Sequence, residues 1–139
     1  MIAVDTSVLV DYIGDGPAAA AAEDALRQAL SAGPVVACEI VVSEVVAALG
    51  HSDVVMETLD AVGIAFSPME LRSAVRAAEM QRRWQERQRR AADPAPARRS
   101  VPDFLIGAHA LLQCQGLITR DAAFFCDYFK GLKVIVPGP

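Results

Sequence analysis

The sequence predicts an α/β domain of three layers, α/β/α, around a mainly parallel sheet of four to five strands. Short apolar runs alternate with segments of helical periodicity along the whole chain. Turn residues, such as Gly33-Pro34 and Gly50, separate these runs. The length of 139 residues and the hydrophobic fraction of 53% suit one domain with a substantial core, so we expect residues 1–139 to form a single domain.

The elements can be placed one by one from local signals. The expected strands cover residues 1–4, 35–38, 64–66, 116–119 and 132–137. The expected helices cover residues 7–14, 17–31, 39–49, 53–62, 67–90 and 101–114, with a helical turn at 120–125. Strands that alternate with helices in this way predict a parallel sheet covered on both faces.

Two segments flank the long helix expected from residue 67. Ser67-Pro68-Met69-Glu70 has the pattern of a capping box with proline at the first helical position, which predicts that the helix begins there. Residues 92–100, "ADPAPARRS", contain two prolines and no apolar period. This segment is expected to be a mobile loop and is a candidate for a flap that faces the substrate.

The charge is unevenly distributed. Residues 72–99 hold nine arginines against three acids, which is +6 and leaves −10 for the rest of a chain whose net charge is −4. A basic segment beside an acidic remainder can present arginine to phosphates. The alternative is that the run is only the solvated face of a long helix. Trp84, within this run, either stacks on a base or packs against the domain.

The chain has the features of a cytoplasmic protein. No apolar run approaches the ~20 residues of a membrane span, so no membrane association is expected. The N-terminus lacks the basic region and cleavage site of a secretory signal. The three cysteines, Cys38, Cys114 and Cys126, are widely spaced among apolar neighbours, which favours reduced core thiols over a disulfide or zinc framework.

Acidic residues recur near the ends of the predicted strands. Asp5 ends the first strand, Asp103 lies in the first turn of the helix before the fourth, and Asp121 follows the fourth. The carboxyl ends of parallel strands share one edge, where ligands bind. Glu44 joins them if its helix leans over this edge, and an unpaired carboxylate in its apolar segment would otherwise be costly. Asp5 taken alone could equally be a helix cap.

Carboxylates gathered at one edge need a positive partner. Each pair about 5 Å apart repels by roughly 3 kcal/mol at an effective dielectric of 20. Since no His or Cys cluster accompanies them, the fitting partner is Mg²⁺ or Mn²⁺. Such a cation can supply a hydroxide nucleophile and neutralise a phosphoryl oxygen. The sequence therefore predicts hydrolysis of a phosphate ester.

Four segments carry a family resemblance. "AVDTSVLVDY", "VVSEVVAAL", "VPDFLIGAHA" and "LITRDAAFF" resemble, in order, the four blocks of PIN domains, and most closely those of the VapC toxins of bacterial toxin–antitoxin pairs. The resemblance implies that Mg²⁺ (or Mn²⁺) is held by an acidic quartet, Asp5, Glu44, Asp103 and Asp121. It further implies that three hydroxyl side chains support the quartet: Thr6, Ser7 and Thr119.

The resemblance also implies an activity and partners. It implies a metal-dependent endoribonuclease, acting on tRNA or rRNA, in which Glu44 orients or deprotonates the attacking water. It implies a homodimer and inhibition by a cognate VapB-type antitoxin whose C-terminal segment fills the active-site groove. Phosphates of the RNA would then meet arginines of the basic run: Arg82, Arg83, Arg87, Arg98 and Arg99.

Two alternatives remain open at this stage. A phosphatase or receiver domain would use Asp5 as nucleophile or phosphoacceptor, although Ser7 stands where a second acid is expected and no lysine lies near the fourth strand. A non-catalytic PIN-like module would only bind RNA or a protein partner. For the other polar residues near these segments, ordinary structural roles are sufficient. His109 fits a core or surface histidine, Asp11 meets solvent or caps, and Arg120, beside Asp121, is one further candidate for a phosphate contact.

Overall fold

The computed structural model describes residues 1–91 and 101–138, and its centre is one sheet of five strands in which every pairing is parallel. In spatial order the strands are β3 (Ile64–Phe66), β2 (Val35–Ala37), β1 (Ile2–Val4), β4 (Gly116–Ile118) and β5 (Val134–Ile135). The predicted α/β class and parallel sheet are confirmed. The expected loop 92–100, with Arg98 and Arg99, lies outside the described residues.

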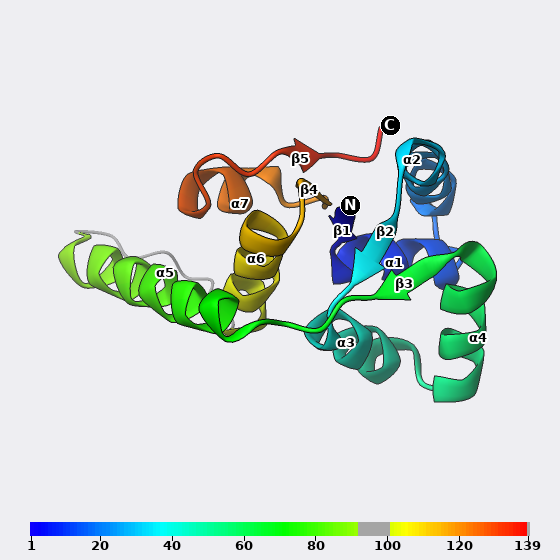
Figure 1. The fold of residues 1–139 in the computed structure, drawn as a ribbon, viewed down its shortest axis with the longest axis horizontal. Helices are drawn as coiled ribbons and strands as arrows, with labels where there is room; N and C mark the ends of the chain where they lie inside the picture. The colour runs from blue at the N-terminus through cyan, green and yellow to red at the C-terminus, as the bar shows by residue number, and fades with distance from the viewer. Residues whose placement is uncertain (92–100, 139) are drawn as a thin grey trace.

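Seven helices connect and cover the described strands. They are α1 (Thr6–Ile13), α2 (Ala19–Ala32), α3 (Glu39–Leu49), α4 (Ser52–Val62), α5 (Leu71–Arg90), α6 (Val101–Gln113) and α7 (Ala122–Tyr128). Figure 1 shows α5 packed beside α6 and extending well beyond the sheet. In the described part of the chain, no helix combines the length and the apolar character needed to cross a bilayer.

The central strands are short and apolar at nearly every position. Val4, Val35, Leu117 and Ile118 are each 0% exposed, and β2 and β4 are buried along their whole length. A strand buried on both faces needs no alternation of polar and apolar residues. This burial confirms the inference of a sheet covered on both faces.

An aromatic core joins the helices on one side of the sheet. The Phe104 ring makes edge contacts with the rings of Trp84, Phe124 and Tyr128, at centroid distances of 6.3, 5.2 and 6.0 Å. Trp84 therefore packs against the domain. Gly107 on α6 leaves the space that the Phe129 ring occupies, because a Cβ at this position would lie 2.3 Å from that ring.

The cysteines are only partly as expected. All three are free, and Cys38 is buried beneath the sheet edge as predicted. Cys126 is instead exposed on α7, so the prediction of a core thiol is wrong there. The helical turn expected around this residue is a seven-residue helix with its buried face formed by phenylalanine and tyrosine, which leaves Cys126 on the outer face.

The start of α5 differs from the prediction. The helix begins at Leu71, and its N-cap Glu70 makes no side-chain capping bond. Ser67 does not cap a helix, because its hydroxyl pairs with His109 Nε2 at 3.0 Å. The main-chain N–H groups of Met69 and Glu70 donate to distant side chains instead of forming a first helical turn. The capping-box prediction is therefore wrong by one turn.

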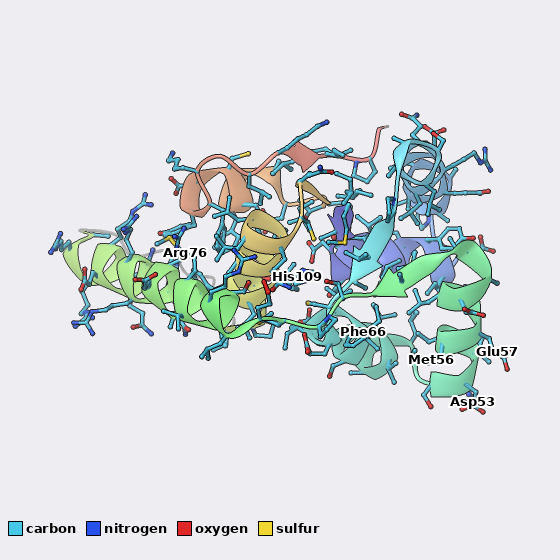
Figure 2. The ribbon with its side chains drawn as sticks, viewed as in Figure 1. Asp53, Met56, Glu57, Phe66, Arg76 and His109 are labelled. Atoms are coloured by element: carbon cyan, nitrogen blue, oxygen red, sulfur yellow. The ribbon has the colours of Figure 1, made fainter. Side chains whose placement is uncertain are left out.

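A group of polar side chains, here called the linker cluster, holds the segment 67–70 between β3 and α5. It consists of Glu39, Ser73, His109 and Gln113. Figure 2 labels His109 where α6 faces this segment. Glu39 accepts from the Met69 N–H at 2.9 Å, and Gln113 accepts from the Glu70 N–H at 2.9 Å. The Gln113 amide donates in turn to the Pro68 carbonyl at 3.0 Å.

Candidate active site

A pocket opens at the carboxyl ends of β1 and β4, and acidic side chains dominate its wall. Its volume is about 490 Å³. The residues that line it, here called the acidic pocket, are Asp5, Thr6, Ser7, Glu44, Asp103, Arg120 and Asp121. The four acids singled out in the sequence thus come together, from the end of β1, from α3, from α6 and from the N-cap of α7.

Asp5 is the most buried of these acids, with an exposed fraction of 7%. It directly follows β1 and is the N-cap of α1, where its Oδ1 accepts from the Thr6 N–H at 2.8 Å. Its Oδ2 accepts from the hydroxyls of Thr119 at 2.6 Å and Ser7 at 3.3 Å. Asp5 therefore caps the helix and faces the pocket at once, so the two interpretations of this residue are compatible.

Thr119 links the segments that follow β1 and β4 through hydrogen bonds of its hydroxyl. It is fully buried, and its hydroxyl donates to Asp5 after β1 while accepting from the Asp121 N–H at 3.0 Å after β4. The Asp5 N–H also donates to the Ile118 carbonyl at 2.9 Å. This buried threonine fixes the relative positions of the segments that carry two of the four acids.

Glu44 reaches the pocket because α3 leans over the carboxyl edge of the sheet. Its Oε1 accepts from the Thr6 hydroxyl at 2.6 Å, and its side chain is half-buried. The predicted supporting hydroxyls thus contact the acids: Thr6 bonds Glu44, whereas Ser7 and Thr119 bond Asp5. Glu39, the other acid of α3, accepts from the Met69 N–H and does not line the pocket.

Residues 2–128 match the PIN domain family. The chain belongs to this family. The fold is also similar to that of solved structures, although no curated protein matches the chain.

Three solved structures illustrate the likeness of this PIN domain. The Rickettsia felis VapBC2 complex bound to a promoter DNA fragment has a TM-score of 0.72 at 16% identity, over 98% of both chains. A toxin–antitoxin complex from Klebsiella pneumoniae has a TM-score of 0.64 at 22% identity, over 99% of this chain and 98% of that one. The Mycobacterium tuberculosis toxin VapC20, which cleaves the sarcin–ricin loop, has a TM-score of 0.52 at 16% identity, over 96% and 99%. At these identities the likeness shows the fold.

In this PIN domain the pocket is unfavourable for the ionised form of Asp5. Burial raises the pKa of Asp5 above its ordinary value, and the neighbouring Asp103 carboxylate raises it further. Hydrogen bonds from Thr119, Thr6 and Ser7 oppose this rise in part. The Asp5 carboxylate is therefore held in the pocket at an electrostatic cost.

The chemistry of these donors fits a hard divalent cation that keeps much of its water. Within residues 1–91 and 101–138, no three His, Cys, Asp or Glu side chains are placed to hold a metal ion between them. Mg²⁺, however, binds to proteins through one or two carboxylates plus several waters. Carboxylate and hydroxyl oxygens that crowd around buried Asp5 suit such a partly hydrated ion.

The candidate arginines of α5 do not line the acidic pocket. Arg82 forms an ion pair with Glu86 at 3.3 Å on the same helix. Arg87 pairs with Asp127 at 2.9 Å and lies over the Tyr128 ring at 5.1 Å. Arg83 lines a separate pocket of about 330 Å³ between α5, α6 and α7. These arginines therefore lie on the long helix, outside the acidic pocket.

One contact at the pocket had no sequence signal. Arg120 Nε pairs with Asp11 Oδ2 at 2.8 Å, and only 16% of the Asp11 side chain is exposed. Asp11 was expected to meet solvent or to cap. The pair joins α1 to the segment after β4. These segments follow the adjacent strands β1 and β4 but are far apart in sequence, so local patterns could not reveal the pair.

Proposed function

We propose that this PIN domain is a VapC-type toxin, a metal-dependent endoribonuclease that hydrolyses phosphodiester bonds of tRNA or rRNA. The observation that supports the proposal is that four acids line one pocket: Asp5, Glu44, Asp103 and Asp121. Hydroxyl groups donate hydrogen bonds to Asp5 and Glu44. An electrostatic cost of this kind is typical of sites that bind a cation or a reacting group. The family match and the fold agree with this assignment.

The residues of the pocket have different proposed roles. Asp5, Asp103 and Asp121 hold Mg²⁺ or Mn²⁺, directly or through water. When bound, this ion lowers the pKa of water and neutralises charge on the phosphoryl oxygens. Thr119 keeps Asp5 and the Asp121 main chain in register, because it bonds both.

Glu44 is proposed to orient or deprotonate the attacking water. The Thr6 hydroxyl fixes its Oε1, and Oε2 is the atom that would accept the proton of the water. The water oxygen bonds to phosphorus in line with the departing 3′ oxygen. The P–O3′ bond breaks, the 3′ oxygen takes up a proton from solvent, and the products are a 5′-phosphate and a 3′-hydroxyl.

The proposed partners follow from the same comparisons. The Rickettsia and Klebsiella neighbours are toxin–antitoxin complexes, which supports a VapB-type antitoxin as the partner of this chain. An arginine or lysine of the inhibitor would substitute for the cation among the carboxylates. We also propose that the chain is a single cytoplasmic domain that forms a homodimer.

A second candidate is a non-catalytic PIN-like module that binds RNA or protein. It is favoured by one observation, namely that no three acids within residues 1–91 and 101–138 are placed to share a metal ion. In that case the acids would serve only to receive basic groups of a partner.

Cleavage of total RNA by purified, antitoxin-free protein separates the two candidates. We expect discrete cuts with Mg²⁺ or Mn²⁺, and none with chelator or with Asp121→Asn. Asp60→Asn removes an exposed acid of α4 and is expected to cleave like the wild type. A folded wild type that binds metal but leaves RNA intact would contradict the nuclease and favour the binding module.

A further inference from the structure

Among the described residues that line the acidic pocket, Arg120 is the basic one. It lies between Thr119 and Asp121, so its main chain is fixed by the hydrogen bond that joins these two residues. Its side chain is 55% exposed, which leaves it accessible at the rim. This guanidinium is therefore available to a phosphate of an RNA strand that enters the pocket.

Asp11 holds the Arg120 side chain in one direction. The bond from Nε to Asp11 Oδ2 is 2.8 Å long, and Asp11 is largely buried. A guanidinium carries five N–H donors, of which Nε provides one and the two terminal nitrogens provide four. A bond at Nε does not use the end of the guanidinium, where the two terminal nitrogens carry N–H groups, and the fork geometry of this end suits two oxygens of a phosphate.

Stability alone does not explain this ion pair. A pair in which one member is more than half exposed contributes only ~0–1 kcal/mol, since solvent screens it. The pair does, however, place a fixed positive charge beside carboxylates that would otherwise repel a polyanion. The arginines of α5 are not at this rim and do not provide that charge.

We propose that Arg120 binds a phosphate of the RNA substrate at the rim of the acidic pocket, and that Asp11 is a positioning residue that aims its guanidinium. This inference rests on the proposed ribonuclease function and adds a substrate contact to it. Binding energy from Arg120 holds the RNA backbone against the repulsion of the acids and places the scissile bond over the pocket.

Fluorescence anisotropy with a labelled single-stranded RNA tests the contact directly. The measurement uses Asp103→Asn as background, in which cleavage is expected to be absent, and follows Kd against salt concentration. Each neutralised phosphate of a single strand contributes about 0.7 to the slope of log affinity against log salt. Arg120→Gln is therefore expected to weaken binding and to reduce the slope by about 0.7, whereas Arg120→Lys keeps the slope.

Two further variants separate positioning from mere charge. Arg27→Gln removes an exposed arginine of α2 that pairs with Glu23, and it is expected to leave Kd and slope unchanged. Asp11→Asn is expected to weaken binding when Arg120 is present and to have no effect in the Arg120→Gln background. This coupling follows only if Asp11 acts through Arg120.

The outcomes distinguish this inference from the proposed function. If Arg120→Gln in the Asp103→Asn background binds RNA with the same Kd and slope as Asp103→Asn alone, while the wild-type protein cleaves RNA with metal, the inference fails and the nuclease stands. If Asp11→Asn weakens binding equally in both backgrounds, the positioning role fails. If folded wild-type protein neither binds nor cleaves RNA, both proposals fail.

Discussion

The acidic pocket and the linker cluster are both assembled from polar side chains of distant segments, yet they have opposite electrostatic character. In the linker cluster, Glu39 and Gln113 satisfy main-chain N–H and carbonyl groups of the segment 67–70. In the acidic pocket, carboxylates face a common open volume, and the pKa of Asp5 is raised. The first arrangement satisfies main-chain groups, whereas the second holds the Asp5 carboxylate in a buried position that disfavours its charge, a cost that a bound cation would relieve. The comparison teaches that a buried acid with a raised pKa among other acids, rather than polarity alone, marks the candidate site.

The largest predicted effect is the loss of cleavage in Thr119→Val. This change removes the donor to Asp5 and the acceptor of the Asp121 N–H, so it loosens two acids at once. Loss of such a supporting bond lowers metal affinity or activity by roughly 10–100-fold. The readout is cleavage rate against Mn²⁺ concentration. Thr58→Val is the matched control, because its hydroxyl bonds only a helix carbonyl outside the pocket, and equal losses in both variants would contradict the account.

The next effect concerns the linker cluster. Gln113→Ala removes the partners of the Glu70 N–H, the Pro68 carbonyl and the fully buried Ser73 hydroxyl. Unsatisfied buried groups cost about 1–3 kcal/mol each, so we expect a loss of unfolding free energy in this range, measured by urea denaturation. Gln28→Ala, on an exposed face of α2, should change it by less than about 0.5 kcal/mol. Cleavage per folded molecule should be unchanged, and a selective loss of activity would break the comparison.

A gain of stability is predicted at the acidic pocket itself. Because the pKa of Asp5 is raised above 3.8, its ionisation disfavours the folded state as the pH rises. Asp5→Asn in chelator should therefore raise the unfolding free energy at pH 7, by roughly 0.5–2 kcal/mol. The gain should disappear below about pH 4, where Asp5 is protonated in both states. A variant less stable than the wild type at pH 7 would show that its hydrogen bonds outweigh the repulsion.

The smallest effect is a pH dependence at His109. Burial lowers its pKa below 6.5, against the opposing influence of Glu39 and Glu70. As the pH falls below 6.5, the His109 side chain binds a proton more readily in the unfolded chain than in the folded protein, so the free energy of unfolding decreases. Urea denaturation at pH 7.5 and 5.5 should show a smaller loss for His109→Gln than for the wild type. His51→Asn, at an exposed position with φ of +51°, should behave like the wild type.

The sequence predicts the position of an acid correctly where the topology of the parallel strands alone determines it. Asp5 and Asp121 follow strands whose parallel pairing brings their carboxyl ends together, so alternation of strands and helices was enough to predict their meeting. Asp103 followed from its place in a first helical turn. The sequence does not fix the position of Glu44, because this position depends on how α3 packs. In the structure, the hydrogen bond from Thr6 to Glu44 shows where the side chain lies.

The linker cluster was missed because its partners are remote. The bonds to residues 67–70 come from Glu39, His109 and Gln113, between 30 and 45 positions away. The local pattern of Ser67 to Glu70 satisfied every requirement of a capping box, and tertiary bonds to the same groups replaced it. The pair of Arg120 and Asp11 was invisible for the same reason.

The most direct test of the account is the effect of Mn²⁺ on thermal unfolding. A ligand that binds only the folded state raises Tm as its concentration increases. We predict that Mn²⁺ raises the Tm of the wild type and of Gln113→Ala by similar amounts, although the latter starts lower, and that it does not raise the Tm of Asp103→Asn. A Tm that is insensitive to Mn²⁺ in the wild type, or equally sensitive in Asp103→Asn, would contradict the claim that the acidic pocket is built to hold a cation.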